Sequence, residues 1–261
     1  MAGYDWISFT TDYGLSDGFV AACHGVIARI TPAVRVIDVT HQVPPADVSR
    51  GAAVLAQTVP YLPAAVHVAV VDPGVGTARR GLAIEAAQGL LVGPDNGLLP
   101  PAADALGGIR RAVALDNAEW FADPVSPTFH GRDIFAPVAA RLAAGGDLAD
   151  AGTDIDPATL VRLPEPIVMV GDGWLEAEVS TVDRFGNVQL AAPGETLDRL
   201  GELLRISGVS ARRVVTFGEA TPGALVVYVD SADRVAIAIN GGRAVVALGV
   251  APGDLVHITT A

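Results

Sequence analysis

The sequence contains a single cysteine, Cys23, and no long uninterrupted apolar segment. One cysteine cannot form an internal disulfide or a thiolate metal site, and it fits a reducing compartment. No segment approaches the roughly 20 consecutive apolar residues that span a bilayer, and the chain does not open with a basic region followed by an apolar run. We therefore expect a globular protein of the cytoplasm that has no membrane anchor.

Basic residues are few: 17 Lys plus Arg stand against 29 Asp plus Glu, giving a formal charge of −12. No basic stripe that would track a phosphate backbone is present, so we expect no nucleic-acid partner. The histidines also lack a metal-ligand spacing, such as two histidines four residues apart with a glutamate. This holds for His24, His41, His67 and His257, and we predict no metal site.

The first part of the chain, residues 1–150, alternates between short β-rich runs and longer Ala-rich segments. The β-rich runs lie at 6–12, 34–40, 66–72, 81–87 and 109–115, and the Ala-rich segments at 17–30, 46–59 and 132–145. Apolar residues in the longer segments recur every three or four positions, which is the helical period. This order predicts an α/β domain with a largely parallel sheet.

A change of composition separates this part from the rest. Residues 151–166 are rich in Gly, Asp and Pro and lack apolar periodicity, which is typical of an interdomain linker. Residues 167–261 consist of short β-rich runs and turns. They predict a small all-β, barrel-like C-terminal domain.

Two predicted strands end in aspartate. In α/β sheets ligands bind at the carboxyl ends of the strands, which makes Asp12 and Asp72 candidate site residues. The Asp12 carboxylate is suited to the vicinal hydroxyls of a ribose, and it is equally suited to capping the turn that follows. The spacing favours neither interpretation.

The stretch "VAVVDPGVGTARRG", residues 68–81, leads from Asp72 through two glycines to Arg79 and Arg80. It lacks the Gly-Lys-Ser/Thr ending of a P-loop, and its glycines do not have the dinucleotide-binding spacing. An ordinary ion pair of Asp72 with Arg79 around a tight turn explains the pattern as well as a site does. Arg80 is expected to face solvent.

Two further stretches of the first part contain candidate residues. Asn96 in "GPDNGLLPP" is explained by a turn with side-chain hydrogen bonding. His130 and Gly131 in "FHGRDIF" stand where a helix is expected to begin. A histidine at a helix N-terminus tends to stay neutral and can accept a proton, although a structural histidine is the alternative.

The stretch "STVDRFGNVQL", residues 180–190, forms a predicted strand-turn-strand corner that contains Asp183, Phe185 and Asn187. Asn can bind an adenine edge, Phe can stack on a ring and Asp can hold an ammonium group. A β-turn with a core aromatic is the alternative. Ser231, in a later turn, contributes to a site only if a ligand lies there.

These stretches contain six short motifs, which occur along the chain in the order "FTTDYG", "VVDPGVGT", "GPDNGLL", "FHGRDIFAP", "VDRFGN" and "AINGG". In this the chain resembles the S-adenosyl-L-methionine (SAM) hydroxide adenosyltransferases, which are related to the bacterial fluorinase and chlorinase, over nearly its whole length. The resemblance implies an α/β N-terminal domain and a β-barrel-like C-terminal domain. It also implies a homotrimer, with each active site between the N-terminal domain of one subunit and the C-terminal domain of the next.

By motif match, the resemblance assigns catalysis to Asp72, Arg79 and His130. It assigns substrate binding to Asp12, Asn96, Gly131, Asp183, Phe185, Asn187 and Ser231. SAM is then the substrate rather than a cofactor, and water attacks the ribose C5′ to give adenosine and L-methionine.

Departures from the halogenases favour water as the nucleophile. The halogenases resembled have tyrosine at the positions of Asp72 and His130, serine at Gly131 and tryptophan at Ala46. Three alternatives remain. One is a halogenase that uses chloride or fluoride, and another is a module that binds SAM or adenosine without turnover. The third, a metal-dependent hydrolase, has little support because the histidines are scattered along the sequence.

Overall fold

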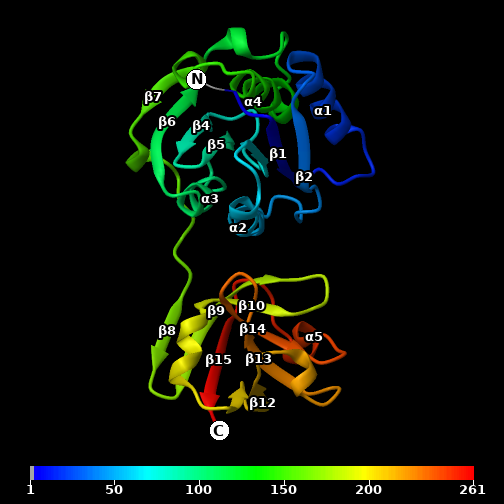
Figure 1. Ribbon diagram of the computed structural model, residues 1–261, viewed down its shortest axis with the longest axis vertical. Helices are drawn as coiled ribbons and strands as arrows, with labels where there is room; N and C mark the ends of the chain where they lie inside the picture. The colour runs from blue at the N-terminus through cyan, green and yellow to red at the C-terminus, as the bar shows by residue number, and fades with distance from the viewer. Residues whose placement is uncertain (1–2) are drawn as a thin grey trace. The chain divides into compact units, whose positions relative to one another are not determined.

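The computed structural model describes residues 3–261. The chain divides after Leu163 into two compact units, which agrees with the predicted two-part organisation (Figure 1). Each unit is built around its own hydrophobic core. We describe the units separately.

The sheet of the first unit has seven strands in the order β2-β1-β3-β5-β4-β6-β7. These strands are β1 (Trp6–Thr11), β2 (Arg35–Thr40), β3 (Val66–Val70), β4 (Gly81–Ala86), β5 (Gly89–Pro94), β6 (Ile109–Leu115) and β7 (Gly152–Ile155). Neighbours from β2 to β5 pair in parallel, whereas β4, β6 and β7 pair antiparallel. The sheet is therefore mixed rather than largely parallel.

The short connection between β4 and β5 explains why these two strands pair antiparallel. A parallel pair needs a crossover of a dozen or more residues, whereas β4 and β5 are joined through a two-residue turn at 87–88. Sequence analysis missed β5, because all six of its residues are buried and the strand therefore shows no polar alternation. Its glycine and proline also made this stretch resemble a turn.

Helices cover both faces of this sheet (Figure 1). One core contains residues of α1 (Phe19–Ile30) and α4 (Ala136–Ala143), and the other contains residues of α2 (Val48–Thr58) and α3 (Pro100–Ala105). The three helical segments expected from the sequence are thus confirmed. Within residues 3–261, none of the helices has the length and hydropathy that crossing a membrane requires.

Short helical turns complete both units. A π-helical turn, η3 (Gly131–Phe135), precedes α4 directly. The 3₁₀ turns are η1 (Val59–Tyr61), η2 (Ala118–Trp120), η4 (Leu148–Ala151), η5 (Pro157–Thr159), η6 (Gly194–Arg199) and η7 (Phe217–Glu219).

Most of the expected linker, residues 151–166, lies within the first unit. β7 pairs with β6 through its backbone, which requires no apolar periodicity in the side chains. Arg80 connects this segment to the unit, since its Nη2 donates to the carbonyl of Thr159 at 2.7 Å and its Nε to the buried Asp95 at 2.8 Å. The Arg80 side chain is 36% exposed, so it reaches solvent as expected, but its guanidinium also pairs with buried Asp95, which needs an opposite charge.

The second unit is a β-barrel. Its strands are β8 (Val168–Gly171), β9 (Trp174–Val182), β10 (Val188–Pro193), β11 (Leu203–Ile206), β12 (Val209–Arg213), β13 (Leu225–Val229), β14 (Arg234–Ile239) and β15 (Leu255–Thr260). β9 pairs with both β15 and β10 and so closes a ring of seven strands, while β8 pairs along β9. Alternate residues of β9 are buried, as a barrel wall requires. A short helix, α5 (Ala244–Leu248), lies between β14 and β15.

Candidate active site

The carboxyl end of β3 positions Asp72. All five residues of β3 are buried, and Asp72 follows the strand by two positions. The Asn96 side chain supports this end: its Nδ2 donates to the carbonyl of Val71 at 2.8 Å, and its Oδ1 accepts from the amide of Leu98 at 3.2 Å. Asn96 therefore connects the turn after β5 to the strand end that precedes Asp72.

The loop after Asp72 returns Arg79 to it. The amides of Val75 and Thr77 donate to the carbonyls of Asp72 and Gly74, each at 3.2 Å, so the loop consists of two consecutive tight turns. Gly76 has a φ of +77°, and a Cβ there would overlap the carbonyl oxygen of Pro127. Glycine is required for both reasons, and it lets the loop pack against the segment that leads to His130.

Asp72 and Arg79 form a buried bidentate ion pair. Arg79 Nε donates to Asp72 Oδ1 at 3.1 Å, and Nη2 donates to Oδ2 at 2.5 Å. The side chains are only 5% and 9% exposed. This is unlike an exposed surface pair, because two buried charges must compensate each other in fixed geometry.

His130 joins the pair through the same guanidinium. Arg79 Nη2 lies 3.0 Å from His130 Nδ1. Since a guanidinium has only donors, Nδ1 must accept, and the proton of the neutral imidazole is then on Nε2. Burial and the Arg79 charge both lower the pKa of His130, so the ring is neutral at pH 7. The expectation of a neutral histidine agrees with this direction, although the causes are burial and Arg79.

The pKa of the Asp72 carboxyl is shifted in the opposite direction to that of His130. Burial raises its pKa above the ordinary value, and the Arg79 charge and hydrogen bonds oppose that shift. The result is an Asp that binds a proton more tightly than an exposed one, beside an Arg that favours the ionised form. A carboxylate of this kind is suited to accepting a proton during a reaction.

Tyr13 belongs to the same cluster, although sequence analysis did not select it. A Cβ at Gly131 would overlap the Tyr13 hydroxyl, so this hydroxyl occupies the space of a side chain at position 131. Burial raises the pKa of Tyr13, and the carboxylates of Asp12 and Asp72 add to the shift. The ring packs edge-on against Phe129 at 5.7 Å between centroids. In the sequence, the only indication of a role for Tyr13 was its position directly after Asp12 in "FTTDYG".

Asp12 lies at the end of β1, as expected. Its Oδ2 accepts from the amide of Ala46 at 2.9 Å. Asp12 is not the cap of α1, whose N-cap is Gly18 without a side-chain hydrogen bond. Ala46 has a φ of +64°, a strained value for alanine that orients its amide toward the carboxylate. Such local strain is often found beside functional groups.

In the second unit, Asp183 and Asn187 stabilise one corner. Asp183 Oδ1 accepts from the backbone amide of Asn187 at 2.9 Å, and its Oδ2 accepts from Asn187 Nδ2 at 2.7 Å. Phe185 between them is 75% exposed. It is therefore not the core aromatic of the alternative interpretation, and its ring is free to stack on a planar ligand.

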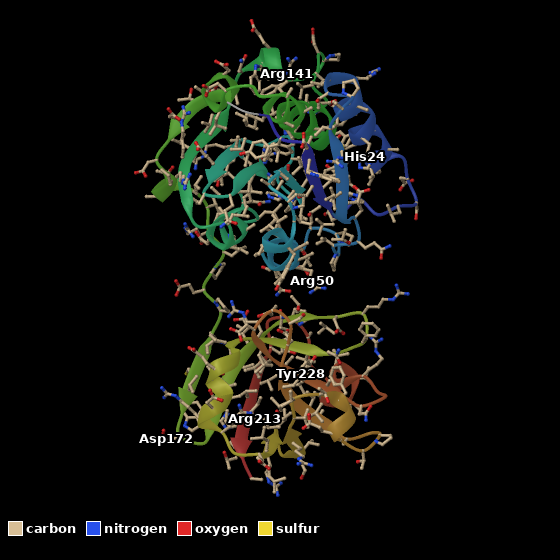
Figure 2. All side chains as sticks on the ribbon, viewed as in Figure 1. His24, Arg50, Arg141, Asp172, Arg213 and Tyr228 are labelled. Carbon is tan, nitrogen blue, oxygen red and sulfur yellow. The ribbon has the colours of Figure 1, made fainter. Side chains whose placement is uncertain are left out.

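Tyr228, labelled in Figure 2, lies on β13 of the second unit. Burial raises the pKa of Tyr228 to about 12, and the carboxylates of Asp230 and Asp183 add to the shift. Ser231 follows Asp230 and is exposed. Sequence analysis did not select Tyr228 or Asp230, because "VVYVDSADR" has the ordinary pattern of a strand and a turn. Asp183 and Asp230 thus place two carboxylates near Tyr228.

The structure thus brings the predicted residues together in two sets. Asp72, Arg79 and His130 are in direct contact in the first unit, beside Gly131 and Tyr13. The corner of Asp183, Phe185 and Asn187 belongs to the second unit, as does the turn of Ser231.

Comparison with known proteins finds relatives that match this chain over nearly its whole length, across both units. A curated relative, the "(R)-S-adenosyl-L-methionine hydrolase" of Salinispora tropica, is 66% identical over 259 residues, which cover 99% of each chain. A "Fluorinase" of an Actinoplanes species is 29% identical over 98% of this chain and 97% of its own. A solved structure of an uncharacterized conserved protein from Thermotoga maritima superposes with a TM-score of 0.90 at 35% identity, covering 97% of this chain and 99% of that one.

Family models match each unit. The SAM hydroxide adenosyltransferase N-terminal domain matches residues 7–152, and the C-terminal domain of the same family matches residues 177–257. Together they cover most of the chain, with the buried cluster of Asp72, Arg79 and His130 inside the first match. The chain therefore belongs to the SAM hydroxide adenosyltransferase family.

Proposed function

We propose that the chain hydrolyses S-adenosyl-L-methionine to adenosine and L-methionine by attack of water on the ribose C5′. The observation that carries this proposal is the buried contact of Arg79 with both Asp72 and His130. The name of the Salinispora tropica relative supports the same reaction.

The chemistry requires little beyond an activated and oriented water. The C5′–S bond breaks with its electron pair moving to sulfur, so methionine leaves as a neutral thioether and no general acid is needed. The new C5′–O bond forms from the water oxygen, which must lose one proton. The enzyme therefore has to hold the water in line with sulfur and accept that proton.

The hydrogen-bond directions divide these tasks between the two residues. Because His130 Nδ1 accepts from Arg79, its Nε2–H is a donor and orients the water through the oxygen. Asp72 is then the proton acceptor, and burial, which raises its pKa, makes it a stronger base. His130 therefore acts as a donor to the water rather than as the proton acceptor considered from the sequence, and Asp72 acts as the acceptor.

Most of the remaining predicted residues are proposed to bind substrate, whereas Gly131 and Asn96 are proposed to shape the site. Asp12 accepts from the ribose hydroxyls, Phe185 stacks on adenine and Asn187 binds its edge. Asp183 and Ser231 bind the amino-acid end, where the nearby Asp230 adds negative charge for the ammonium. Gly131 makes room for the Tyr13 hydroxyl, and Asn96 acts by holding the strand end rather than by touching substrate.

A halogenase reaction is the competing proposal, and two observations argue against it. An ionised Asp72 repels a halide ion, and the Tyr13 hydroxyl already fills the space beside Gly131 where the halogenases have serine. We expect chromatography of a reaction with SAM in excess chloride or fluoride to show adenosine alone. A 5′-halo-5′-deoxyadenosine peak would contradict the proposal, and saturable binding without product would identify a binding module.

Substitution of the proton acceptor tests the assignment of roles. Asp72→Asn keeps the shape of the side chain but cannot accept a proton, so we expect kcat to fall by about 10²-fold to 10⁴-fold. Asp154 offers a matched control, because it forms an exposed bidentate pair with Arg111, at 2.6 and 2.9 Å. Asp154→Asn should leave kcat unchanged, and full turnover of Asp72→Asn would refute the assignment.

The pH profile tests the same groups. Asp72 must be ionised and His130 neutral, so both lose their proton before the enzyme is active. The pKa of Asp72 lies above its ordinary 3.8 and that of His130 below its ordinary 6.5. We therefore expect kcat/KM, measured from initial rates, to rise with pH while the two groups lose their protons and to be level once both have lost them, from about pH 7.5 to 8.5. A continued rise over that upper range would point to a different base.

We further propose that the protein acts as a homotrimer in the reducing cytoplasm, with the second unit of one subunit completing the site of its neighbour. The exposed Phe185 and the division of the predicted substrate contacts between the two units support this. Light scattering of the pure protein should give three times the 26.7 kDa of one chain. A monomeric mass at working concentration would contradict it.

A further inference from the structure

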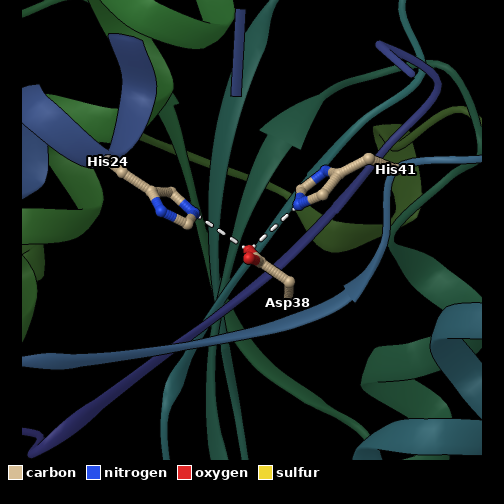
Figure 3. Close-up of side chains that lie close together, drawn as sticks. All are labelled: His24, Asp38 and His41. Carbon is tan, nitrogen blue, oxygen red and sulfur yellow. Dashed lines mark hydrogen bonds and ion pairs between the residues drawn. The ribbon is translucent and has the colours of Figure 1, made fainter. Parts of the chain in front are cut away.

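Three residues outside the proposed site converge on one point in the first unit: His24 on α1, Asp38 on β2 and His41 just after β2 (Figure 3). His24 Nε2 lies 2.9 Å from Asp38 Oδ1, and His41 Nε2 lies 3.0 Å from the same oxygen. The spacing of the histidines in the sequence predicted no metal site. It could not reveal this cluster, because only the fold brings the three residues together from separate elements. The cluster thus has a composition and geometry that the sequence did not reveal.

His41 carries the strongest sign of a missing ligand. Its side chain is 3% exposed, and Nε2 is buried without a hydrogen-bond partner among the described residues, despite its distance of 3.0 Å from Asp38 Oδ1. The approach to the carboxylate therefore lacks the direction of an N–H···O bond. A buried polar atom of this kind costs about 1–3 kcal/mol and calls for a water or an ion.

The donor set suits a transition metal ion. One nitrogen from each imidazole and one carboxylate oxygen lie within 4.8 Å of one another. Tetrahedral Zn²⁺, with bonds of about 2.0–2.2 Å, separates its ligands by about 3.3 Å, so small shifts of these side chains suffice. Imidazole ligands favour Zn²⁺ and its neighbours over Mg²⁺ and Ca²⁺. The partial exposure of His24 and Asp38 leaves a further ligand position to water.

Surrounding groups hold the two rings in place. His41 Nδ1 and Thr11 Oγ1 are 2.9 Å apart, the kind of second hydrogen bond that metal-binding histidines make. The Phe9 ring packs edge-on against His41 at 5.1 Å and tilted against His24 at 5.9 Å. The cluster is thus preorganised on the core.

We propose that His24, Asp38 and His41 bind one divalent transition metal ion, with Zn²⁺ as the preferred ion. The ion connects α1, the end of β2 and, through Thr11, the end of β1. The carbonyl of His41 also accepts from the amide of Gly14 at 2.7 Å, which brings the segment that contains Asp12 under the same restraint. The role is structural, and the hydrolytic chemistry does not pass through the ion.

Zinc binding to the metal-stripped, untagged full-length protein tests this proposal. Titration against a chromophoric chelator should show one Zn²⁺ per chain, with no competition from Mg²⁺. His24→Ala and Asp38→Asn should each weaken binding by at least about tenfold, and Thr11→Val by about tenfold. The matched control is His257→Ala, since His257 is a half-exposed histidine 3.5 Å from Glu176 and should not affect binding.

A second measurement separates a site from a folding defect. His24 also packs against Phe9 and contacts Asp38, so each variant is compared with its own unfolding temperature in the absence of metal. Zn²⁺ should then raise the unfolding temperature of the wild type and of His257→Ala, but not of His24→Ala. The proposal is overturned if the wild type binds no Zn²⁺, or if Asp38→Asn and His24→Ala bind it as tightly as the wild type.

Discussion

The first unit's site depends on one side chain, the Arg79 guanidinium, which contacts Asp72 through two nitrogens and His130 through one of them. Because Arg carries only donors and a permanent charge, this contact fixes the ionisation of one partner and the tautomer of the other. Arg79 Nη1 also donates to the carbonyl of Arg80 at 3.1 Å, which holds the guanidinium in position. The strand end, the glycine loop and the π-helical turn after His130 all serve to place these groups.

Burial gives this arrangement its reactivity. An exposed Asp beside Arg would be a weak base, whereas burial raises the pKa of Asp72 against the effect of Arg79. The same burial lowers the pKa of His130 and keeps the ring neutral. The two opposite shifts leave a basic carboxylate beside a neutral N–H donor, which is the pair that the proposed water activation needs.

Local patterns were sufficient to predict most of the fold and the positions of several candidate residues. The helical periods of α1, α2 and α4 and the Asp residues at strand ends depend on neighbours in sequence, and they were predicted correctly. β5 was missed because it is buried on both faces, and most of the expected linker pairs with the sheet through its backbone. Tyr13 and the cluster of His24, Asp38 and His41 were missed because only the folded chain brings their partners together.

In the proposed reaction, water positioned by Asp72 and His130 attacks C5′ of S-adenosyl-L-methionine. Isotopic labelling tests this most directly: the pure protein is incubated with the substrate in water enriched in oxygen-18, and the nucleoside product is fragmented in a mass spectrometer. The account predicts adenosine with one label, located in the 5′-hydroxyl group. Unlabelled adenosine, or a label at another carbon, would contradict it.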